Sequence, residues 1–160
     1  MADKIIPMLW FDTQAEEAAR FYCSVFKKSK LGKIARYPEG GPGKPGSVMT
    51  VEFKLAGQDY VALNGGPQFK FTEAISLVVN CKDQEEIDYY WDRLLQGGGK
   101  PVQCGWLRDR FGLSWQVTPA DWNKLYTGKD KAKAQRVFTA MMGMVKMDLA
   151  ALKRAAKGPK

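Results

Sequence analysis

The 160-residue chain contains no histidine, and this absence limits the chemistry that its side chains can perform. Without an imidazole the chain cannot build a Ser-His-Asp or Cys-His nucleophilic site, a HExxH zinc site, or a metal triad of two histidines and a carboxylate. It also lacks the group that most often transfers protons near neutral pH. The candidates that remain are carboxylate, lysine, tyrosine, cysteine and serine side chains.

The cysteines and carboxylates do not form a recognisable reactive cluster. Cys23, Cys81 and Cys104 are odd in number and widely spaced, and no CxxC pair is present, so the sequence predicts neither a zinc ribbon nor a disulfide framework. Free thiols fit a reducing compartment, and we expect the protein to be cytoplasmic. The acidic pairs at 16–17 and 85–86 fall in the expected first turns of helices, where the helix dipole accounts for them. They offer no acid–base pair.

The charge of the chain is concentrated at one end. The formal net charge is +8, although residues 1–123 hold equal numbers of acidic and basic side chains. Residues 124–160 hold ten lysines and arginines against two aspartates. Because only Tyr126 and Phe138 are interleaved with these charges, the segment lacks the stacking platform of a nucleic-acid-binding protein. We expect a solvated basic helix face and no nucleic-acid partner.

Length and hydropathy indicate one ordinary domain. A chain of 160 residues that is 45% hydrophobic can bury a substantial core. No apolar run approaches the ~20 residues that a membrane span needs, and the opening MADK has no basic segment ahead of an apolar one. We therefore expect no membrane association and no secretory signal.

Local patterns predict two copies of one arrangement of strands and a helix. Strands are expected, from apolar alternation and length, at 4–11, 30–37, 48–55, 60–64, 74–80, 106–108 and 113–118. Apolar residues at helical spacing predict helices across 13–26 and 83–95. When the sequence is aligned with itself so that Ala18 falls on Ile87, the apolar positions of these two helices coincide. A duplicated module of this length predicts an α+β fold with a ligand cleft between paired modules.

The end of the chain is predicted to be a helical tail. Helical segments are expected at 132–144 and 145–156 from the spacing of their apolar residues. A methionine cluster lies in this tail, at Met141, Met142, Met144 and Met147. Methionine suits either an adaptable interface or ordinary helix packing, and both interpretations stay open.

Three stretches of the sequence resemble a known family. They are PMLWFDTQAEEAARFYCSVF, YVALNGGPQFKFTEAISLVVNCKDQEEIDYYWDRL and QCGWLRDRFGLSWQVTP. They resemble the PhnB-like proteins of the vicinal oxygen chelate (glyoxalase, bleomycin-resistance, dioxygenase) superfamily, many of which carry the label 3-demethylubiquinone-9 3-methyltransferase. The resemblance extends over nearly the whole chain, including the helical tail.

The resemblance implies a particular organisation of the chain. Residues 1–160 form a single vicinal-oxygen-chelate domain of paired βαβββ modules, with a U-shaped sheet around a cavity. The modules cover about 1–66 and 72–119, and the helical tail covers about 120–160. The family expectation is a homodimer.

The resemblance also implies where a metal would lie. Enzymes of the superfamily hold a divalent ion with His, Glu or Gln at four places, one on the first and one on the last strand of each module. In this chain the places fall at Ile5 or Ile6, at Ala62, at Ala74 with Glu73 beside it, and at Gln116. Aliphatic residues supply no ligand for a divalent ion. We therefore expect no metal of the glyoxalase type and no cofactor.

The methyltransferase label finds no support in the residues. A Rossmann-type methyltransferase needs a glycine-rich turn between a strand and a helix for its adenosyl cofactor. The glycine clusters at 40–46 and 97–99 lie instead in a loop and after a helix, where they are typical of turns and helix ends.

The residues that should line the cleft follow from strand periodicity, because side chains two apart share a face. Two aromatics in the loop after residue 66 add a possible lid. The predicted ligand-binding residues are Met8, Trp10, Asn64, Phe69, Ser76, Cys104, Ser114 and Gln116. This lining is mostly apolar, with two amides, two hydroxyls and one thiol, and no catalytic residue can be assigned within it. Cys104 would be reactive only if nearby positive charge lowered its pKa.

Three hypotheses about function remain. The first is a metal-free protein that binds or sequesters a small, mostly apolar organic molecule. The alternative is an enzyme of the vicinal oxygen chelate type, lyase- or isomerase-like or acting on a quinone-like substrate, with an atypical site. The third is an interaction module that uses the basic tail on an anionic partner. Fold resemblance alone does not choose among them.

Overall fold

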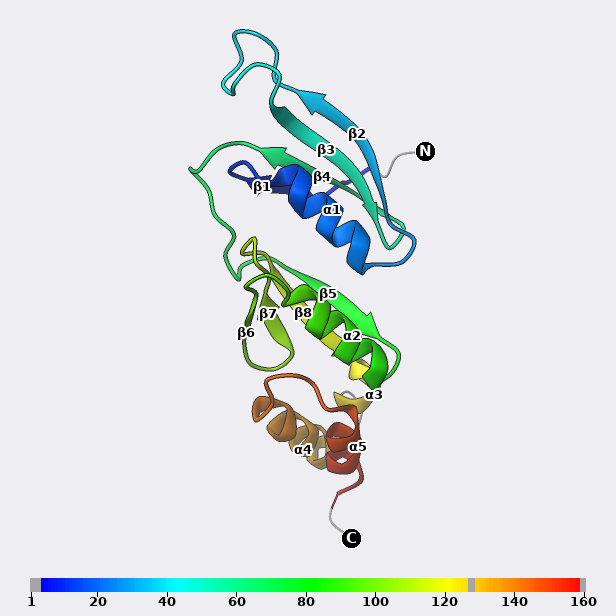
Figure 1. Cartoon of the computed structure of the whole chain (residues 1–160). Helices are drawn as coiled ribbons and strands as arrows, with labels where there is room; N and C mark the ends of the chain where they lie inside the picture. Colours follow the sequence, from blue (N-terminus) through cyan, green and yellow to red (C-terminus); the bar gives the residue numbers. More distant parts are fainter. Residues whose placement is uncertain (1–3, 127–128, 159–160) are drawn as a thin grey trace. The chain divides into compact units, whose positions relative to one another are not determined.

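The computed structural model describes residues 4–126 and 129–158. The chain divides into two compact units, Met1–Phe71 and Thr72–Lys160, which we call the first and second unit. Each unit contains one four-stranded sheet with a helix packed on one of its faces (Figure 1). We call the opposite face of each sheet its open face.

The first unit runs strand, helix, then three strands. In chain order its elements are β1 (Met8–Phe11), α1 (Ala15–Val25), β2 (Lys30–Arg36), β3 (Val48–Leu55) and β4 (Gln58–Asn64). The sheet order is β1-β4-β3-β2, with β1 parallel to β4 and the other pairs antiparallel. Strand β1 is shorter than the expected 4–11, because Pro7 has no amide hydrogen for the ladder.

The core of the first unit lies between α1 and its sheet. Helix α1 buries Ala18, Tyr22 and Val25, as its helical spacing predicts. The sheet presents to this helix the alternate, buried side chains of β1, β3 and β4. These are Leu9, Phe11, Val51, Phe53, Leu55, Tyr60 and Ala62. The strand period of two therefore leaves Met8, Trp10 and Val61 on the open face.

The second unit repeats this order of elements. They are β5 (Ser76–Cys81), α2 (Gln84–Leu94), β6 (Lys100–Pro101), β7 (Trp106–Arg108) and β8 (Ser114–Pro119). The sheet order is β5-β8-β7-β6, again with the first strand parallel to the last. Helix α2 buries Ile87, Trp91 and Leu94, the counterparts of the buried α1 residues. The expected pair of βαβββ modules is confirmed.

Main-chain hydrogen bonds fix how the two units correspond. The amide of Gly65 donates to the carbonyl of Phe11 (2.9 Å), and the amide of Ala120 donates to the carbonyl of Cys81 (2.7 Å). Phe11 therefore corresponds to Cys81, and Gly65 to Ala120. Phe11 and Cys81 match, so Met8 matches Val78. Because Met8 pairs with Val61 and Val78 pairs with Gln116, Val61 is the counterpart of Gln116.

Three helices follow the second sheet. They are α3 (Trp122–Tyr126), α4 (Lys131–Met142) and α5 (Leu149–Lys157). The expected helix at 145–156 begins later, because the Asp148 side chain accepts a hydrogen bond from the amide of Ala151 (2.8 Å) and caps α5. Residues 143–148 between α4 and α5 are therefore not helical.

The helices of the described residues are all short. None of those within 4–126 and 129–158 combines the length and apolar character that crossing a bilayer requires.

Candidate functional site

The open face of the second sheet carries uncharged polar side chains in register. Parallel pairing aligns Val78 with Gln116 and Asn80 with Thr118, and antiparallel pairing places Trp106 opposite Gln116. The other face of the same strands packs its apolar side chains against α2. Alternation along two strands thus collects amides and a hydroxyl on one surface.

The helical tail closes part of this open face into a pocket. The pocket has a volume of about 480 Å³, within the usual range for small-molecule sites. Its floor comes from Val78, Asn80, Gln116 and Thr118, with Cys104 and Trp106 beside them. Its remaining wall comes from the residues after the sheet: Ala120, Trp122, Asn123, Phe138, Met141 and Met147. None of these side chains is charged.

Several polar groups in the pocket have hydrogen-bonding capacity that the chain does not use. Gln116 Nε2 donates to Ser76 Oγ (2.9 Å), which fixes the amide and leaves its oxygen without a hydrogen bond among the described residues. Within the same described part of the chain, the side chains of Asn80 and Thr118 make no hydrogen bond. These groups can therefore accept from or donate to a bound molecule.

Cys104 lies in the pocket in an unusual backbone conformation. Its φ is +58°, a region that few residues other than glycine adopt. Its Sγ contacts Met142 Sδ at 3.8 Å. Of the arginines close to it in sequence, Arg108 is paired with Glu73 and Arg110 lies over the ring of Phe111.

The other two cysteines are poor nucleophiles. Burial, with smaller contributions from Glu86 and Asp83, raises the pKa of the Cys81 thiol to about 12. Burial also raises the pKa of the Cys23 thiol. All three cysteines are free. Because the thiolate is the reactive form, any thiol chemistry of this chain would fall to Cys104.

The structure gathers the remaining predicted second-unit residues near the pocket. Ser76 and Ser114 are register partners on the face that carries Gln116. Ser76 holds the Gln116 amide, whereas Ser114 is only 2% exposed. The strand period therefore predicted correctly that Ser76, Ser114 and Gln116 share a sheet face, and further steps of two along the same strands reach Asn80 and Thr118.

Three predicted residues lie together in the first unit. Met8 is exposed on the open face, and Trp10 lies on the same face of β1. The Trp10 ring packs edge-on against Phe69, with centroids 5.0 Å apart, and its Nε1 donates to the Gly66 carbonyl (2.9 Å). This aromatic pair anchors the loop that follows β4.

Asn64 occupies a different position from the one expected. It shares a face with Phe11 and Ala62, on the α1 side of the sheet. Its Oδ1 accepts from the amide of Ala15 (2.8 Å), and its Nδ2 donates to the carbonyl of Val48 (3.1 Å). The expectation placed Ala62 toward the cleft, and the register differs from that expectation by one residue, which reverses the face.

The observed register changes one of the four implied metal places. The correspondence of the units makes Val61 the counterpart of Gln116, in place of the expected Ala62, and it makes Ile6, one of the two residues expected on the first strand, the counterpart of Ser76. None of Val61, Ile6 and Ser76 carries a carboxylate or an imidazole. Glu73, the acidic residue beside Ala74, forms an exposed ion pair with Arg108. Its pKa is lowered by its backbone hydrogen bond and by Arg108.

The described residues contain no group of three or more Cys, Asp or Glu side chains placed to share a metal ion. What the pocket offers instead is hydrogen bonding by amides and a hydroxyl, with aromatic and thioether packing. This arrangement can bind and orient an uncharged molecule. The whole tail-derived wall escaped prediction, because the sequence gives no signal for which face of a sheet a later helix covers.

Comparisons with known proteins agree with this architecture, whose paired modules define the glyoxalase/bleomycin resistance/dioxygenase class of fold. The family model described as 3-demethylubiquinone-9 3-methyltransferase matches residues 3–118. The chain therefore belongs to this PhnB-like family, as its sequence motifs predicted. The match ends before the helical tail, although the resemblance was expected to include it.

Solved structures show the same fold. A PhnB protein from Bacillus cereus, described as a 3-demethylubiquinone-9 3-methyltransferase, is 40% identical with a TM-score of 0.67, over 74% of this chain and 100% of its own. Protein PA1353 from Pseudomonas aeruginosa is 19% identical with a TM-score of 0.60, over 74% of this chain and 98% of its own.

A more distant structure is the fosfomycin resistance protein FosX from Listeria monocytogenes, complexed with Mn(II) and sulfate. It is 13% identical with a TM-score of 0.53, over 78% of this chain and 94% of its own. At this identity the likeness concerns the fold alone. None of the curated proteins compared with the chain matches it.

Proposed function

We propose that the second unit binds a small, uncharged, mostly apolar organic molecule in the pocket between its open sheet face and the helical tail, without a metal. The observation that carries this proposal is the lining: every side chain around about 480 Å³ is apolar or an uncharged polar group. An anion or cation would lose its hydration without gaining a partner of opposite charge, which costs several kcal/mol. A neutral molecule avoids that cost.

The lining also indicates the shape of the ligand. Trp106, Trp122 and Phe138 provide aromatic surface, and Met141 and Met147 provide adaptable thioethers. The unused amide and hydroxyl groups lie on the sheet side. A flat ring system with one hydrogen-bonding edge directed at Gln116 and Asn80 would satisfy both surfaces.

Calorimetric titration of the full chain tests this proposal with probes of equal shape and different charge. We expect 2-naphthol and coumarin to bind and 2-naphthoate to bind at least roughly tenfold more weakly. The variant Gln116→Leu should bind 2-naphthol about tenfold more weakly, because a hydrogen-bonding group is lost. The control Gln103→Leu makes the same change at an exposed position outside the pocket. Equal binding of naphthol and naphthoate would refute the proposal.

The alternative function is an enzyme of the superfamily's lyase or isomerase kind, or one acting on a quinone-like substrate, with an atypical site. The observation that favours it is Cys104, a free thiol that lines the pocket beside Trp106. Metal analysis of protein purified without chelators separates the two functions. A stoichiometric divalent ion would support the enzyme and would count against the metal-free binder.

We also propose a cytoplasmic homodimer. Free cysteines support the compartment, since disulfides are rare there. An exposed apolar side chain on the open face of the first sheet supports self-association: Met8 is 59% exposed. Such side chains are usually covered in the assembled protein.

A further inference from the structure

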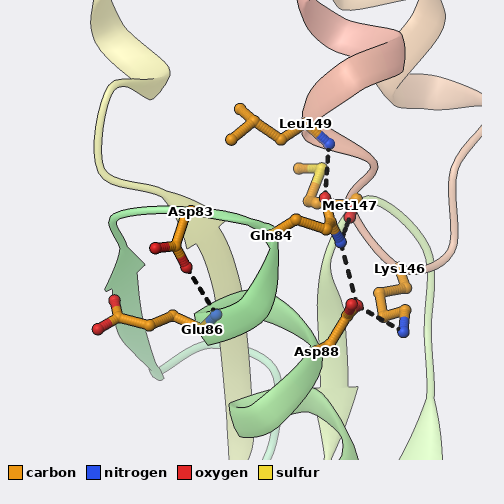
Figure 2. Close-up of polar contacts among 7 residues, drawn as sticks. All are labelled: Asp83, Gln84, Glu86, Asp88, Lys146, Met147 and Leu149. Atoms are coloured by element: carbon orange, nitrogen blue, oxygen red, sulfur yellow. Dashed lines mark hydrogen bonds and ion pairs between the residues drawn. The ribbon is translucent and has the colours of Figure 1, made fainter.

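Residues 143–149, which we call the strap, connect α4 to α5 and contact the body of the second unit. The strap carries Met147, which is 2% exposed and lines the pocket. Figure 2 shows that two side chains of α2, Gln84 and Asp88, reach the strap from the helix N-terminus. The strap is thus the point at which the tail is fixed to the sheet and helix.

Gln84 holds the strap with both ends of its amide. Its Nε2 donates to the Met147 carbonyl (3.1 Å), and its Oε1 accepts from the Leu149 amide (2.8 Å). The two bonds bracket Asp148, whose side chain caps α5. One glutamine therefore fixes both the main chain of Met147 and the first residue of α5 (Figure 2).

Asp88 adds a charged contact one turn further along α2. Its Oδ1 pairs with Lys146 Nζ at 2.7 Å and accepts from Gln84 Nε2 at 3.1 Å. The start of α2 is itself well fixed, because Asp83 accepts from the Glu86 amide (2.9 Å). Gln84 and Asp88 lie four residues apart and so face the strap together.

The opposite side of the strap is bonded to the chain near β7. The amide of Cys104 donates to the Met144 carbonyl, and the amide of Gly105 donates to the Val145 carbonyl, each at 2.8 Å. Gly105 permits this approach: a Cβ there would lie 2.8 Å from the Val117 carbonyl oxygen and 2.9 Å from Met147 Cγ. The strap is therefore held between α2 and the strand edge.

These contacts couple α2 to a pocket that it does not line. We infer that Gln84 and Asp88 are positioning residues for the ligand: through the strap they fix Met147 and the α4 wall, and so set binding affinity without touching the bound molecule. The inference rests on the proposed function. It concerns a wall that belongs to the tail, beyond the residues 3–118 that match the family.

The first experiment measures whether the strap is held, and it needs no ligand. Amide hydrogen exchange is followed at Leu149, Cys104 and Gly105, whose donors bond Gln84 or the strap. The variants Gln84→Met and Asp88→Lys should raise exchange at these amides about tenfold or more, while amides of β5 and β8 stay protected. The control Gln96→Met removes an exposed amide just after α2.

The second experiment measures affinity for 2-naphthol by calorimetry in the same variants. We expect about tenfold weaker binding for Gln84→Met and Asp88→Lys, and no change for Gln96→Met. The double variant Asp88→Lys with Lys146→Asp restores the ion pair with its charges exchanged, so it should recover both protection and affinity. A general loss of stability would not be rescued in this way.

The two measurements together separate the possible failures. Unchanged exchange in Gln84→Met and Asp88→Lys would overturn the inference and leave the proposed function intact. Increased exchange with unchanged naphthol affinity would overturn it as well, because the strap would not control the pocket. If wild-type protein binds neither 2-naphthol nor coumarin, the proposed function fails and the inference fails with it, whatever the exchange result.

Discussion

At Asp109, one carboxylate organises the turn that sends β7 into β8. The side chain is 3% exposed. Its Oδ1 accepts from the amides of Phe111 (2.8 Å) and Leu113 (3.1 Å), and its Oδ2 accepts from Trp115 Nε1 (2.8 Å). The bond to Trp115 adds a fixed point for β8, and β8 carries Gln116.

Replacing this carboxylate should be costly. We expect Asp109→Ala to lower the free energy of unfolding by about 2–4 kcal/mol, because three donors lose their acceptor in a buried place. Urea denaturation followed by fluorescence measures the change. The control Asp12→Ala removes an exposed carboxylate for which no side-chain hydrogen bond is found among the described residues. An equal, small effect of the two substitutions would contradict this role.

The carboxyl of Asp88 makes the strap sensitive to acid. Hydrogen bonds from Lys146 and then from Gln84 hold the pKa of Asp88 below its usual value. A lowered folded-state pKa stabilises the docked strap above the unfolded pKa of about 3.9, and this stabilisation is lost as the pH falls through the folded pKa. Because the side chain is 45% exposed, solvent screening keeps the effect small.

An NMR titration of the Asp88 carboxyl carbon tests this assignment. In Lys146→Met the pKa of Asp88 should rise toward its usual value, since the principal cause of the shift is removed. Asp92, an exposed carboxylate on the same helix, serves as an internal reference. An unchanged Asp88 titration in the variant would contradict the pairing with Lys146.

At the scale of elements, helix α1 depends on a side chain far away in the sequence. Its own N-cap residue, Gln14, makes no capping hydrogen bond with its side chain. Asn64, at the end of β4, accepts from the amide of Ala15 instead, and it also donates to the carbonyl of Val48 at the start of β3. One amide therefore joins the helix start to two strands, in place of the local cap that a helix usually has.

These contacts predict a structural role for Asn64 and no role in ligand binding, and substitution of Asn64 separates the two roles. We expect Asn64→Ala to lower the free energy of unfolding by about 1–2 kcal/mol, through loss of the cap and of the bond to Val48. Binding of 2-naphthol, measured by calorimetry, should not change. Asn64→Asp, which keeps the acceptor for Ala15, should be the milder substitution. A loss of naphthol affinity without loss of stability would support the original assignment of Asn64 to the cleft.

At the scale of the whole molecule, the proposed homodimer gives the last prediction. Light scattering on the full chain should give a mass twice the 17.9 kDa of the chain. Met8→Lys places a charge on an exposed apolar position of β1 and should shift the protein toward monomer, because a charge buried in an interface costs several kcal/mol. The control variant Gln58→Lys adds the same charge at an exposed polar position of β4. Monomeric wild-type protein would contradict the proposal.

The repeated pattern in the sequence was sufficient to predict the architecture. Apolar spacing located both helices, and the match of Ala18 to Ile87 revealed the duplication. The boundaries were less accurate: β1 begins after Pro7, and the two-residue β6 was not predicted. Short strands show little periodicity in the sequence, so their boundaries depend on hydrogen bonding to a neighbouring strand.

The sequence by itself determined the class of fold, the chemical character of the second sheet face and the limits on catalysis. These follow from local periodicity and from the absence of histidine, both of which are properties of the chain alone. Only the tertiary structure decided the register that turns Asn64 toward α1, and the docking of the tail that completes the pocket. Both depend on contacts between residues distant in sequence, which no local pattern encodes.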